Sequence, residues 1–275
     1  AVRLPYRAAL AVGWLTAALA FYGARYRRAE AERRIRQVFD SRCSRRRARQ
    51  VAWAAFRNLC FSAIDALRGS RIDAAWIARH VKGEQAFLAV LEQNRKGRAV
   101  LLAIPHMGSW ELAASVCRLK GIPLFSIAAR QKNPLFNDAL NRQREQAGIT
   151  ILTRGEVSFR AMRRLLESGR NFVVLPDVRN PTPALAIPFL GGVANIAAGM
   201  ALFARQTGAP IYPCYLVRHG WTRHTIAMGD PVWPDPAQPR EADLSRMTET
   251  VFRLFDEAIR KHPDQWFWFN KRWIL

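Results

Sequence analysis

The sequence predicts an α/β fold with a mixed, mainly parallel central sheet flanked by helices, preceded by an N-terminal membrane-anchoring helix and a helical segment. Three observations lead to this prediction. Short apolar runs alternate with amphipathic stretches over residues 99–217. The 275 residues are 50% hydrophobic, which is enough to build one large core. A nearly uninterrupted apolar run over residues 8–23 precedes all of these elements.

The first element, Ala8–Gly23, is apolar and has arginines on both sides. Crossing a bilayer takes roughly 20 apolar residues, so this run is marginal as a span and favours a helix anchored in the membrane interface. A signal peptide is disfavoured because dense arginine follows the run directly. We therefore predict a membrane anchor and basic flank over residues 1–28.

The next stretch is strongly basic. Its arginines are Arg33, Arg34, Arg36, Arg42, Arg45, Arg46, Arg47 and Arg49, against Glu30, Glu32 and Asp40. Each cation beside an anionic leaflet contributes about 1 kcal/mol, so this stretch would support an apolar anchor that is short by itself. Without the apolar neighbour, a solvated helical face would be the simpler interpretation.

Helices and strands then follow in order. Ser44 is placed to cap a helix that runs to Gly69, and two further helices are expected over 72–80 and 84–93. Strands are expected over 99–104, 123–128, 149–152, 171–175 and 210–217. Helices are expected over 111–119, 134–147 and 157–168, and an amphipathic helix with an apolar stripe over 244–259 ends before Pro263.

The formal net charge is +22, carried mostly by arginine, which predicts an anionic partner. Nucleic acid, an acidic membrane and a phosphorylated substrate all satisfy this charge. A nucleic-acid-binding protein is disfavoured, because here the basic density lies beside an apolar anchor. The four cysteines are far apart, with no metal-ligand spacing and no disulfide framework, so we expect a reduced, cytoplasmic-facing domain.

His106 follows a predicted buried strand, and Glu111 falls in the first turn of the next helix. Ligands of α/β sheets gather beyond the carboxyl ends of strands, so we expect His106 to act as general base and Glu111 to fix its tautomer. Ser109 is expected to cap the helix and Cys117 to pack inside it, which leaves direct attack by a substrate hydroxyl on a thioester. From composition alone, a structural histidine beside a helix-terminal glutamate is as frequent as a catalytic pair.

The segment Ile104-Pro105-His106-Met107-Gly108-Ser109-Trp110-Glu111 resembles the His-x-x-x-x-Asp/Glu motif of the lipid A late acyltransferases. Further blocks occur in the family's order. They are Arg130-Gln131-Lys132-Asn133-Pro134-Leu135-Phe136 with Asn141-Arg142, then Leu175-Pro176-Asp177, Pro188-Phe189-Leu190-Gly191 and Pro263-Asp264-Gln265-Trp266-Phe267-Trp268 with Lys271-Arg272-Trp273. Arg179 stands where the family often has a second acidic residue, and Leu190 replaces an aromatic residue.

This resemblance implies site residues beyond His106 and Glu111. Arg142 matches an arginine thought to assist catalysis or substrate binding. Asp177 takes the family's carboxylate position and is expected to bind substrate, whereas from the sequence alone it could equally be a helix cap or a turn residue before Pro181. Arg130 and Asn133 belong to the same block as Arg142 and are expected to bind substrate. Arg154, which precedes a basic helix, is also expected to contact substrate phosphates or the donor protein, although such arginines more often form a solvated face.

The resemblance also implies a single acyltransferase domain over residues 29–275. Its reaction would be transfer of a fatty acyl chain from acyl carrier protein to a hydroxyl of a membrane glycolipid, a lipid A precursor, at the cytoplasmic side of the bacterial inner membrane. The expected partners are acyl carrier protein, the glycolipid and inner membrane lipids, with no nucleic acid, no metal and no cofactor other than the acyl-carrier co-substrate. Another glycolipid or a lysophospholipid is the alternative acceptor, although phospholipid-building relatives usually have aspartate where Glu111 stands.

Overall fold

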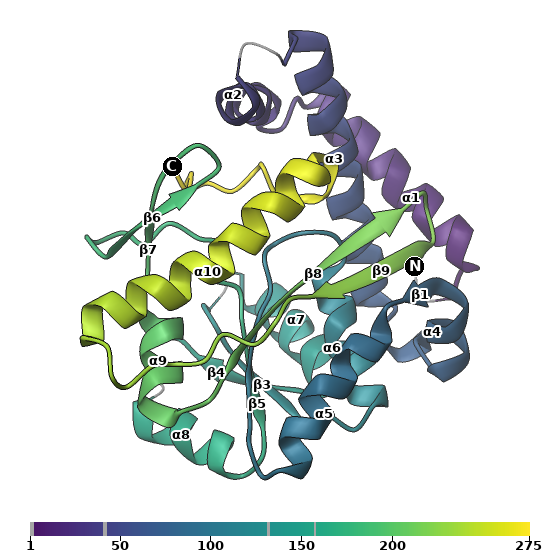
Figure 1. Ribbon diagram of the computed structural model, residues 1–275. Helices are drawn as coiled ribbons and strands as arrows, with labels where there is room; N and C mark the ends of the chain where they lie inside the picture. Colours follow the sequence, from purple (N-terminus) through teal and green to yellow (C-terminus); the bar gives the residue numbers. More distant parts are fainter. Residues whose placement is uncertain (1–2, 41–42, 131–132, 157) are drawn as a thin grey trace.

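The computed structural model describes residues 3–40, 43–130, 133–156 and 158–275, and a seven-stranded sheet lies at its centre (Figure 1). Arg42, Gln131, Lys132 and Val157, which belong to segments discussed above, lie outside the described residues. The strand order is β1-β9-β8-β2-β5-β3-β4. The strands are β1 Val81–Lys82, β2 Leu101–Ala103, β3 Leu124–Ala128, β4 Ile149–Thr153, β5 Asn171–Val174, β8 Ile211–His219 and β9 Arg223–Met228.

The sheet is mixed and mainly parallel, as predicted. Strands β8, β2, β5, β3 and β4 all run in one direction. Strand β9 pairs antiparallel with β8, and the short β1 pairs parallel with β9. A separate antiparallel hairpin, β6 Leu185–Phe189 and β7 Gly192–Ile196, was not expected from the sequence.

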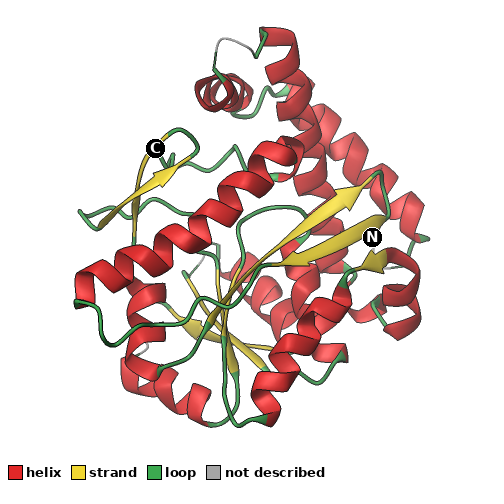
Figure 2. Cartoon of the chain, in the orientation of Figure 1, coloured by secondary structure: helices red, strands yellow, loops and turns green. Residues whose placement is uncertain are grey.

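Helices cover both faces of the sheet (Figure 2). Side chains along β2 alternate between two apolar clusters, because successive residues of a strand point to opposite faces. Leu101 and Ala103 pack with α9 and α10, whereas Leu102 packs with α5 and α6. The helices are α2 Arg28–Phe39, α3 Arg45–Leu67, α4 Ala74–His80, α5 Leu88–Arg95, α6 Trp110–Leu119, α7 Pro134–Gln146, α8 Phe159–Glu167, α9 Gly199–Thr207 and α10 Arg240–Lys261.

The apolar N-terminal run forms helix α1, Tyr6–Ala18, which continues through a π-helical turn to Gly23. One face of α1 packs against α3, where a Cβ added to Gly13 would lie 3.0 Å from the Ile64 side chain. Within the described ranges, no single helix has the length and hydropathy needed to cross a membrane. The segments Tyr6–Gly23 and Arg28–Phe39 meet that requirement only together, as a pair bent by 89°. The N-terminal anchor therefore stays a prediction.

Helix α3 begins as the sequence predicts, because the Ser44 hydroxyl accepts a hydrogen bond from the backbone N–H of Arg47. Near its other end, α3 carries a buried carboxylate, Asp65, that ties several elements together. Asp65 accepts hydrogen bonds from the hydroxyl of Tyr6 on α1 and from the guanidinium of Arg218 on β8. Burial raises the pKa of Asp65, but the nearby Arg218 charge and these hydrogen bonds outweigh burial and lower it.

His224 on β9 lies beside this carboxylate, with its Nε2 atom 3.8 Å from the Asp65 carboxylate. Burial first, and the Arg218 charge second, lower the pKa of His224 to about 3. Between that value and its ordinary pKa near 6.5, the unfolded chain binds one proton more than the folded chain does. His224 therefore makes the folded protein less stable as the pH falls through this range.

We expect the free energy of unfolding of the wild type to lose about 2 kcal/mol between pH 7 and pH 5 through His224 alone. His224→Gln should lack this part of the pH dependence, because glutamine does not titrate. Urea unfolding at the two pH values measures it, and His219→Gln, at an exposed histidine of the neighbouring strand, should keep the wild-type dependence. Equal pH dependence in His224→Gln and the wild type would contradict the expectation.

Candidate active site

The predicted site residues follow the carboxyl ends of neighbouring parallel strands. His106 follows β2 and Asp177 follows β5, and these two strands are adjacent in the sheet. Arg130 follows β3 and Arg154 follows β4, the next two strands of the same parallel set. The carboxyl ends of parallel strands meet at one edge, where α/β sheets bind their ligands. The fold thus places four of the predicted residues along one edge.

His106 and Asp177 form a close pair. The Nδ1 atom of His106 lies 2.7 Å from Oδ1 of Asp177, and the backbone N–H of His106 donates to Oδ2 at 2.8 Å. The indole N–H of Trp266 donates to the same Oδ2 atom at 2.8 Å. Burial raises the pKa of Asp177, but the His106 charge and the three hydrogen bonds outweigh burial and lower it. Asp177 is therefore an ionised acceptor that holds a proton on Nδ1 of His106.

The structure corrects the expected role of Glu111. The carboxylate that fixes the tautomer of His106 belongs to Asp177, so the predicted His106–Glu111 pairing is wrong. Glu111 Oε1 instead accepts hydrogen bonds from Arg144 on α7, at 2.9 Å from Nη2 and 3.3 Å from Nε. The spacing of five residues misled the prediction, because α6 turns the Glu111 side chain toward α7. A catalytic part for Glu111 stays a prediction.

The loop that carries His106 is held by the C-terminal segment and by β8. The backbone N–H of Phe267 donates to the carbonyl of His106, and that of Gly108 donates to the carbonyl of Gln265. Gly108 has a φ of +60°, and a Cβ atom added there would lie 2.2 Å from the Leu216 carbonyl oxygen. Only glycine fits this close approach of the loop to β8.

Ser109 does not cap α6 with its side chain, contrary to the prediction. Its hydroxyl donates instead to Oδ2 of Asp65 at 2.8 Å, deep in the core. Ser62 on α3 also reaches the loop, since its hydroxyl donates to the carbonyl of Gly108 at 2.9 Å. The buried carboxylate of α3 therefore fixes the far end of the loop, while Asp177 fixes the end that carries His106.

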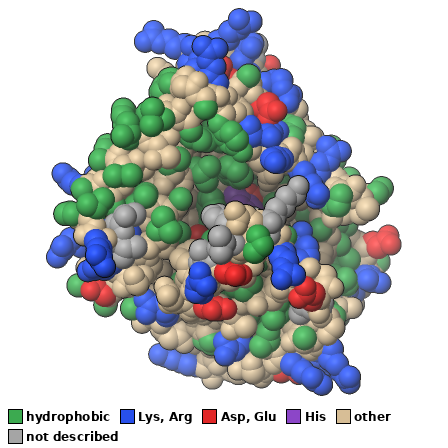
Figure 3. Space-filling view, turned by 180° about the vertical axis from the view of Figure 1, so that it is seen from behind, with side chains coloured by type: hydrophobic (Ala, Val, Ile, Leu, Met, Phe, Trp, Pro, Cys, Tyr) green, Lys and Arg blue, Asp and Glu red, His purple; other side chains and the backbone are tan. Residues whose placement is uncertain are grey.

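The other ring nitrogen of His106, Nε2, has no hydrogen-bond partner among the described residues, and the side chain is 25% exposed. Trp110 and Phe267 border the imidazole, with ring centroids 5.4 and 6.4 Å from it. Figure 3 shows a hollow on one face of the molecule with a histidine side chain at its base and hydrophobic side chains around it. A histidine so oriented, with Nδ1 held and Nε2 open, can accept a proton from a bound hydroxyl.

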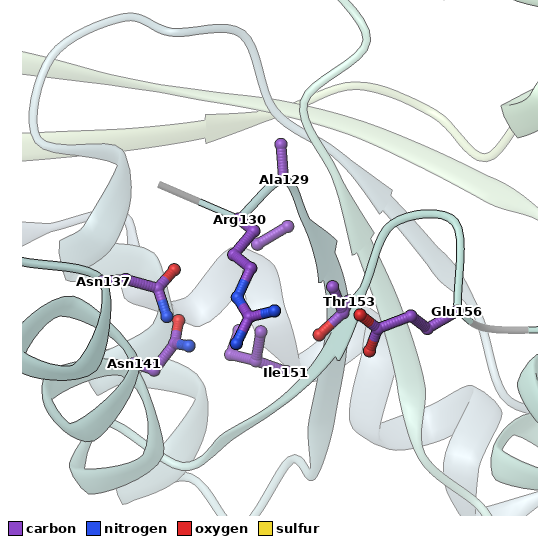
Figure 4. Close-up of a pocket in the computed structure, with 8 residues that line it drawn as sticks. Ala129, Arg130, Asn137, Asn141, Ile151, Thr153 and Glu156 are labelled. Carbon is purple, nitrogen blue, oxygen red and sulfur yellow. The ribbon is translucent and has the colours of Figure 1, made fainter. Parts of the chain in front are cut away.

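A polar cavity of about 290 Å³ lies at the same edge, beyond β3 and β4. Its walls include Arg130, Asn141, Thr153 and Glu156. In Figure 4 the Arg130 guanidinium lies between Asn137 and Asn141 of α7 on one side and Thr153, the last residue of β4, and Glu156 on the other. A cation, amides, a hydroxyl and a carboxylate together suit a ligand rich in hydroxyl or phosphate groups.

The remaining predicted residues lie on the surface. Asn133, Arg142 and Arg154 are exposed. The sequence did not predict two residues that contact the site, Arg144, which binds Glu111, and Trp266, which binds Asp177. Arg144 lies on α7, the same helix as the predicted Arg142 and two positions after it. The sequence therefore predicted the correct helix, but it did not predict that Arg144 contacts Glu111. Trp266 belongs to the closing block of the family resemblance, and the structure buries it. Within the described ranges, no three His, Cys, Asp or Glu side chains converge as metal ligands would.

An ionised aspartate that holds one ring nitrogen of a partly exposed histidine, at the edge of the parallel strands, is an arrangement that suits a general base. The chain belongs to the bacterial lipid A biosynthesis acyltransferase family, whose family model matches residues 1–274. This confirms the family that the sequence resembles.

Curated relatives are phosphatidylinositol mannoside acyltransferases. The protein of Mycolicibacterium smegmatis is 26% identical over 65% of this chain and 58% of its own length, and that of Mycobacterium tuberculosis strain H37Rv is 24% identical over 65% of this chain and 55% of its own. The match thus spans little more than half the length of these relatives. A solved structure, the 1-acyl-sn-glycerophosphate acyltransferase PlsC from Thermotoga maritima, is 18% identical with a TM-score of 0.41, covering 90% of this chain and 94% of that chain.

Gly108→Ala should destabilise the protein, because alanine meets both a left-handed backbone and the Leu216 carbonyl. Gly97→Ala is a matched control, since Gly97 has a φ of +71° with nothing within 4 Å of an added Cβ. We expect Gly97→Ala to lose about 1 kcal/mol of unfolding free energy and Gly108→Ala to lose about 3 kcal/mol or more. Urea unfolding measures both, and equal losses would show that the loop does not need this close approach.

Proposed function

We propose that this chain transfers a fatty acyl group from the thioester of acyl carrier protein to a hydroxyl of a membrane glycolipid, with a lipid A precursor as acceptor. The observation that carries the proposal is the His106–Asp177 pair, with Nδ1 held by an ionised carboxylate, Nε2 without a hydrogen-bond partner among the described residues, and a side chain that is 25% exposed. Family membership supports acyl transfer as the reaction.

In the proposed mechanism, Nε2 of His106 removes the proton of the acceptor hydroxyl as its oxygen attacks the thioester carbonyl. The tetrahedral intermediate then collapses, the bond from carbon to sulfur breaks, and the carrier leaves as a thiolate that takes the proton from His106. The products are an ester and the free thiol, and no covalent enzyme intermediate forms. Asp177 stabilises the imidazolium between these two proton transfers.

Charge supports both proposed substrates. Acyl carrier protein is acidic, and a basic surface attracts an acidic partner and speeds their encounter. The polar cavity beside Arg130 would take the phosphate or sugar part of the acceptor, at the same edge as His106. Arg130, Asn133, Arg142 and Arg154 remain proposed substrate contacts, and Arg130 lines the polar cavity.

The curated relatives suggest a second candidate acceptor. These relatives are named for acylation of phosphatidylinositol mannosides, which are glycolipids that carry a phosphate and sugar hydroxyls, as lipid A precursors do. A lysophospholipid is the remaining alternative. We propose that the chain acts at the cytoplasmic side of the inner membrane, where it would meet both acyl carrier protein and the glycolipid acceptor.

The first test compares acyl transfer by the wild type, His106→Ala and Asp177→Asn in detergent, using acyl carrier protein loaded with a radiolabelled acyl chain. Removing the base should lower kcat by about 10²-fold or more, and Asp177→Asn should do likewise because it no longer favours the reactive tautomer. His219→Ala, at an exposed histidine on β8, is the control and should keep full activity. Lipid A precursor, phosphatidylinositol mannoside and lysophosphatidic acid serve as separate acceptors. Full activity of His106→Ala would end the proposed mechanism.

A second test separates two neighbouring arginines of α7. Arg144 forms an ion pair with the largely buried Glu111, whereas Arg142 is exposed. Removing Arg144 leaves Glu111 without its partner beside the His106 loop, so Arg144→Gln should lower kcat/KM by about tenfold or more, or about 1.4 kcal/mol. Arg142→Gln, which removes the same charge two residues away, should have the smaller effect. A larger loss in Arg142→Gln would show that a substrate contact of Arg142 matters more for turnover than the ion pair between Arg144 and Glu111.

A further inference from the structure

Helix α1 and the turn after it leave an apolar stripe on the surface. Val12, Leu15, Leu19 and Tyr22 recur at spacings of three and four residues, so they share one face, and they are 49%, 55%, 64% and 50% exposed. The opposite face, which carries Ala9 and Gly13, packs on α3. Helices of water-soluble proteins rarely stay apolar on the side away from their core. We call these four exposed residues the α1 stripe.

A second cavity lies where the α1 stripe reaches the beginning of α3. It has a volume of about 350 Å³ and is lined by Tyr22, Arg45, Arg46, Arg49, Gln50 and Trp53. The rings of Tyr22 and Trp53 lie 5.0 Å apart, and Trp53 also contacts Trp14 at 5.9 Å. Aromatic side chains thus form the wall on the side of the stripe, while arginines form the wall on the side of α3.

Two of the three arginines that line this cavity are available to bind an anion. Arg49 donates to Glu32 at 3.2 Å, but Arg45 and Arg46 are exposed and have no acidic partner among the described residues. The first turn of α3 contains no acidic residue, although a helix N-terminus favours negative charge and disfavours cations. A bound phosphate would neutralise both the arginines and the positive end of this 23-residue helix.

We propose that this cavity binds the phosphate of an anionic phospholipid headgroup in the bilayer, while the α1 stripe lies among the acyl chains below it. The order of the features matches the order of a leaflet, with apolar side chains first, Tyr22 and Trp53 at the boundary, and arginines at the level of the phosphates. The inference deepens the proposed membrane placement, but it does not depend on acyl transfer, since it shares no residue with the His106 site.

The features favour a lipid over other anionic or apolar partners. A second copy of this chain would cover the α1 stripe, but it would bring a molecule of charge +22 against the same arginines. Nucleic acid would satisfy the arginines but would leave the apolar stripe in water. A bilayer that contains anionic lipid accounts for both halves of the surface.

The experiment measures binding of the full chain to vesicles of phosphatidylcholine with and without phosphatidylglycerol. Arg45→Gln/Arg46→Gln should weaken binding to the anionic vesicles by about 25-fold, which corresponds to about fivefold for each arginine. Arg33→Gln/Arg36→Gln removes the same charge from exposed positions of α2 outside the cavity and should have a clearly smaller effect. Equal losses in the two double variants would overturn the headgroup site, because binding would then follow net charge alone.

The stripe is tested with a matched pair. Leu15→Ser/Leu19→Ser should lose binding to both kinds of vesicle, whereas Leu67→Ser/Leu88→Ser, at leucines of α3 and α5 with exposures of 57% and 53%, should not. A wild-type dimer in sedimentation that Leu15→Ser/Leu19→Ser dissolves would assign the stripe to a second copy and overturn the proposal. Acyl transfer in detergent is measured on the same variants. Binding to the lipid headgroup without acyl transfer would support this inference and contradict the proposed function. Acyl transfer without binding to the headgroup would support the proposed function and overturn this inference.

Discussion

The buried carboxylate of Asp177 is the interaction on which the site depends. It joins three segments that are far apart in sequence: the loop after β2 through His106, its own loop after β5, and the C-terminal segment through Trp266. A carboxylate without partners could not stay ionised in the core, so its hydrogen bonds are required for burial as well as for the proposed catalytic role. The adjacency of β2 and β5 is what brings these partners within reach.

A second buried carboxylate acts on the same loop from the opposite side. Asp65 accepts a hydrogen bond from Ser109, three residues after His106, and is neutralised by Arg218 on β8. The Arg218 backbone N–H in turn donates to Gln265, whose own carbonyl binds Gly108. The loop is thus fixed at both ends by ionised groups in the core. A base held this rigidly loses little entropy when a substrate hydroxyl is brought to it.

Local pattern was enough to predict the order of most elements and the position of His106, because an apolar strand followed by a turn and a helix is visible in sequence. It could not predict the partner of His106. Which strands become neighbours depends on how the whole sheet packs, so the pairing of β2 with β5, and hence of His106 with Asp177, had no local signal. Glu111 was expected as the partner because spacing along the chain was the only distance that sequence offers. The β6–β7 hairpin was missed since Pro188 and two glycines interrupt its apolar pattern.

Helix α1 is connected to the His106 loop through Asp65, so the proposed membrane contact of α1 would also fix the position of His106 relative to the membrane. Tyr6 on α1 and Ser109 beside the loop bind the two oxygens of one carboxylate, Asp65. A helix in the interface would therefore hold the general base at a fixed height above the leaflet, with no flexible linker between them. Since a glycolipid presents its hydroxyls at a height set by its own anchor in the leaflet, a rigid connection reduces the conformational entropy lost when hydroxyl and base meet. On this proposal, the packing of α1 against α3 positions His106 for the reaction and also stabilises the fold.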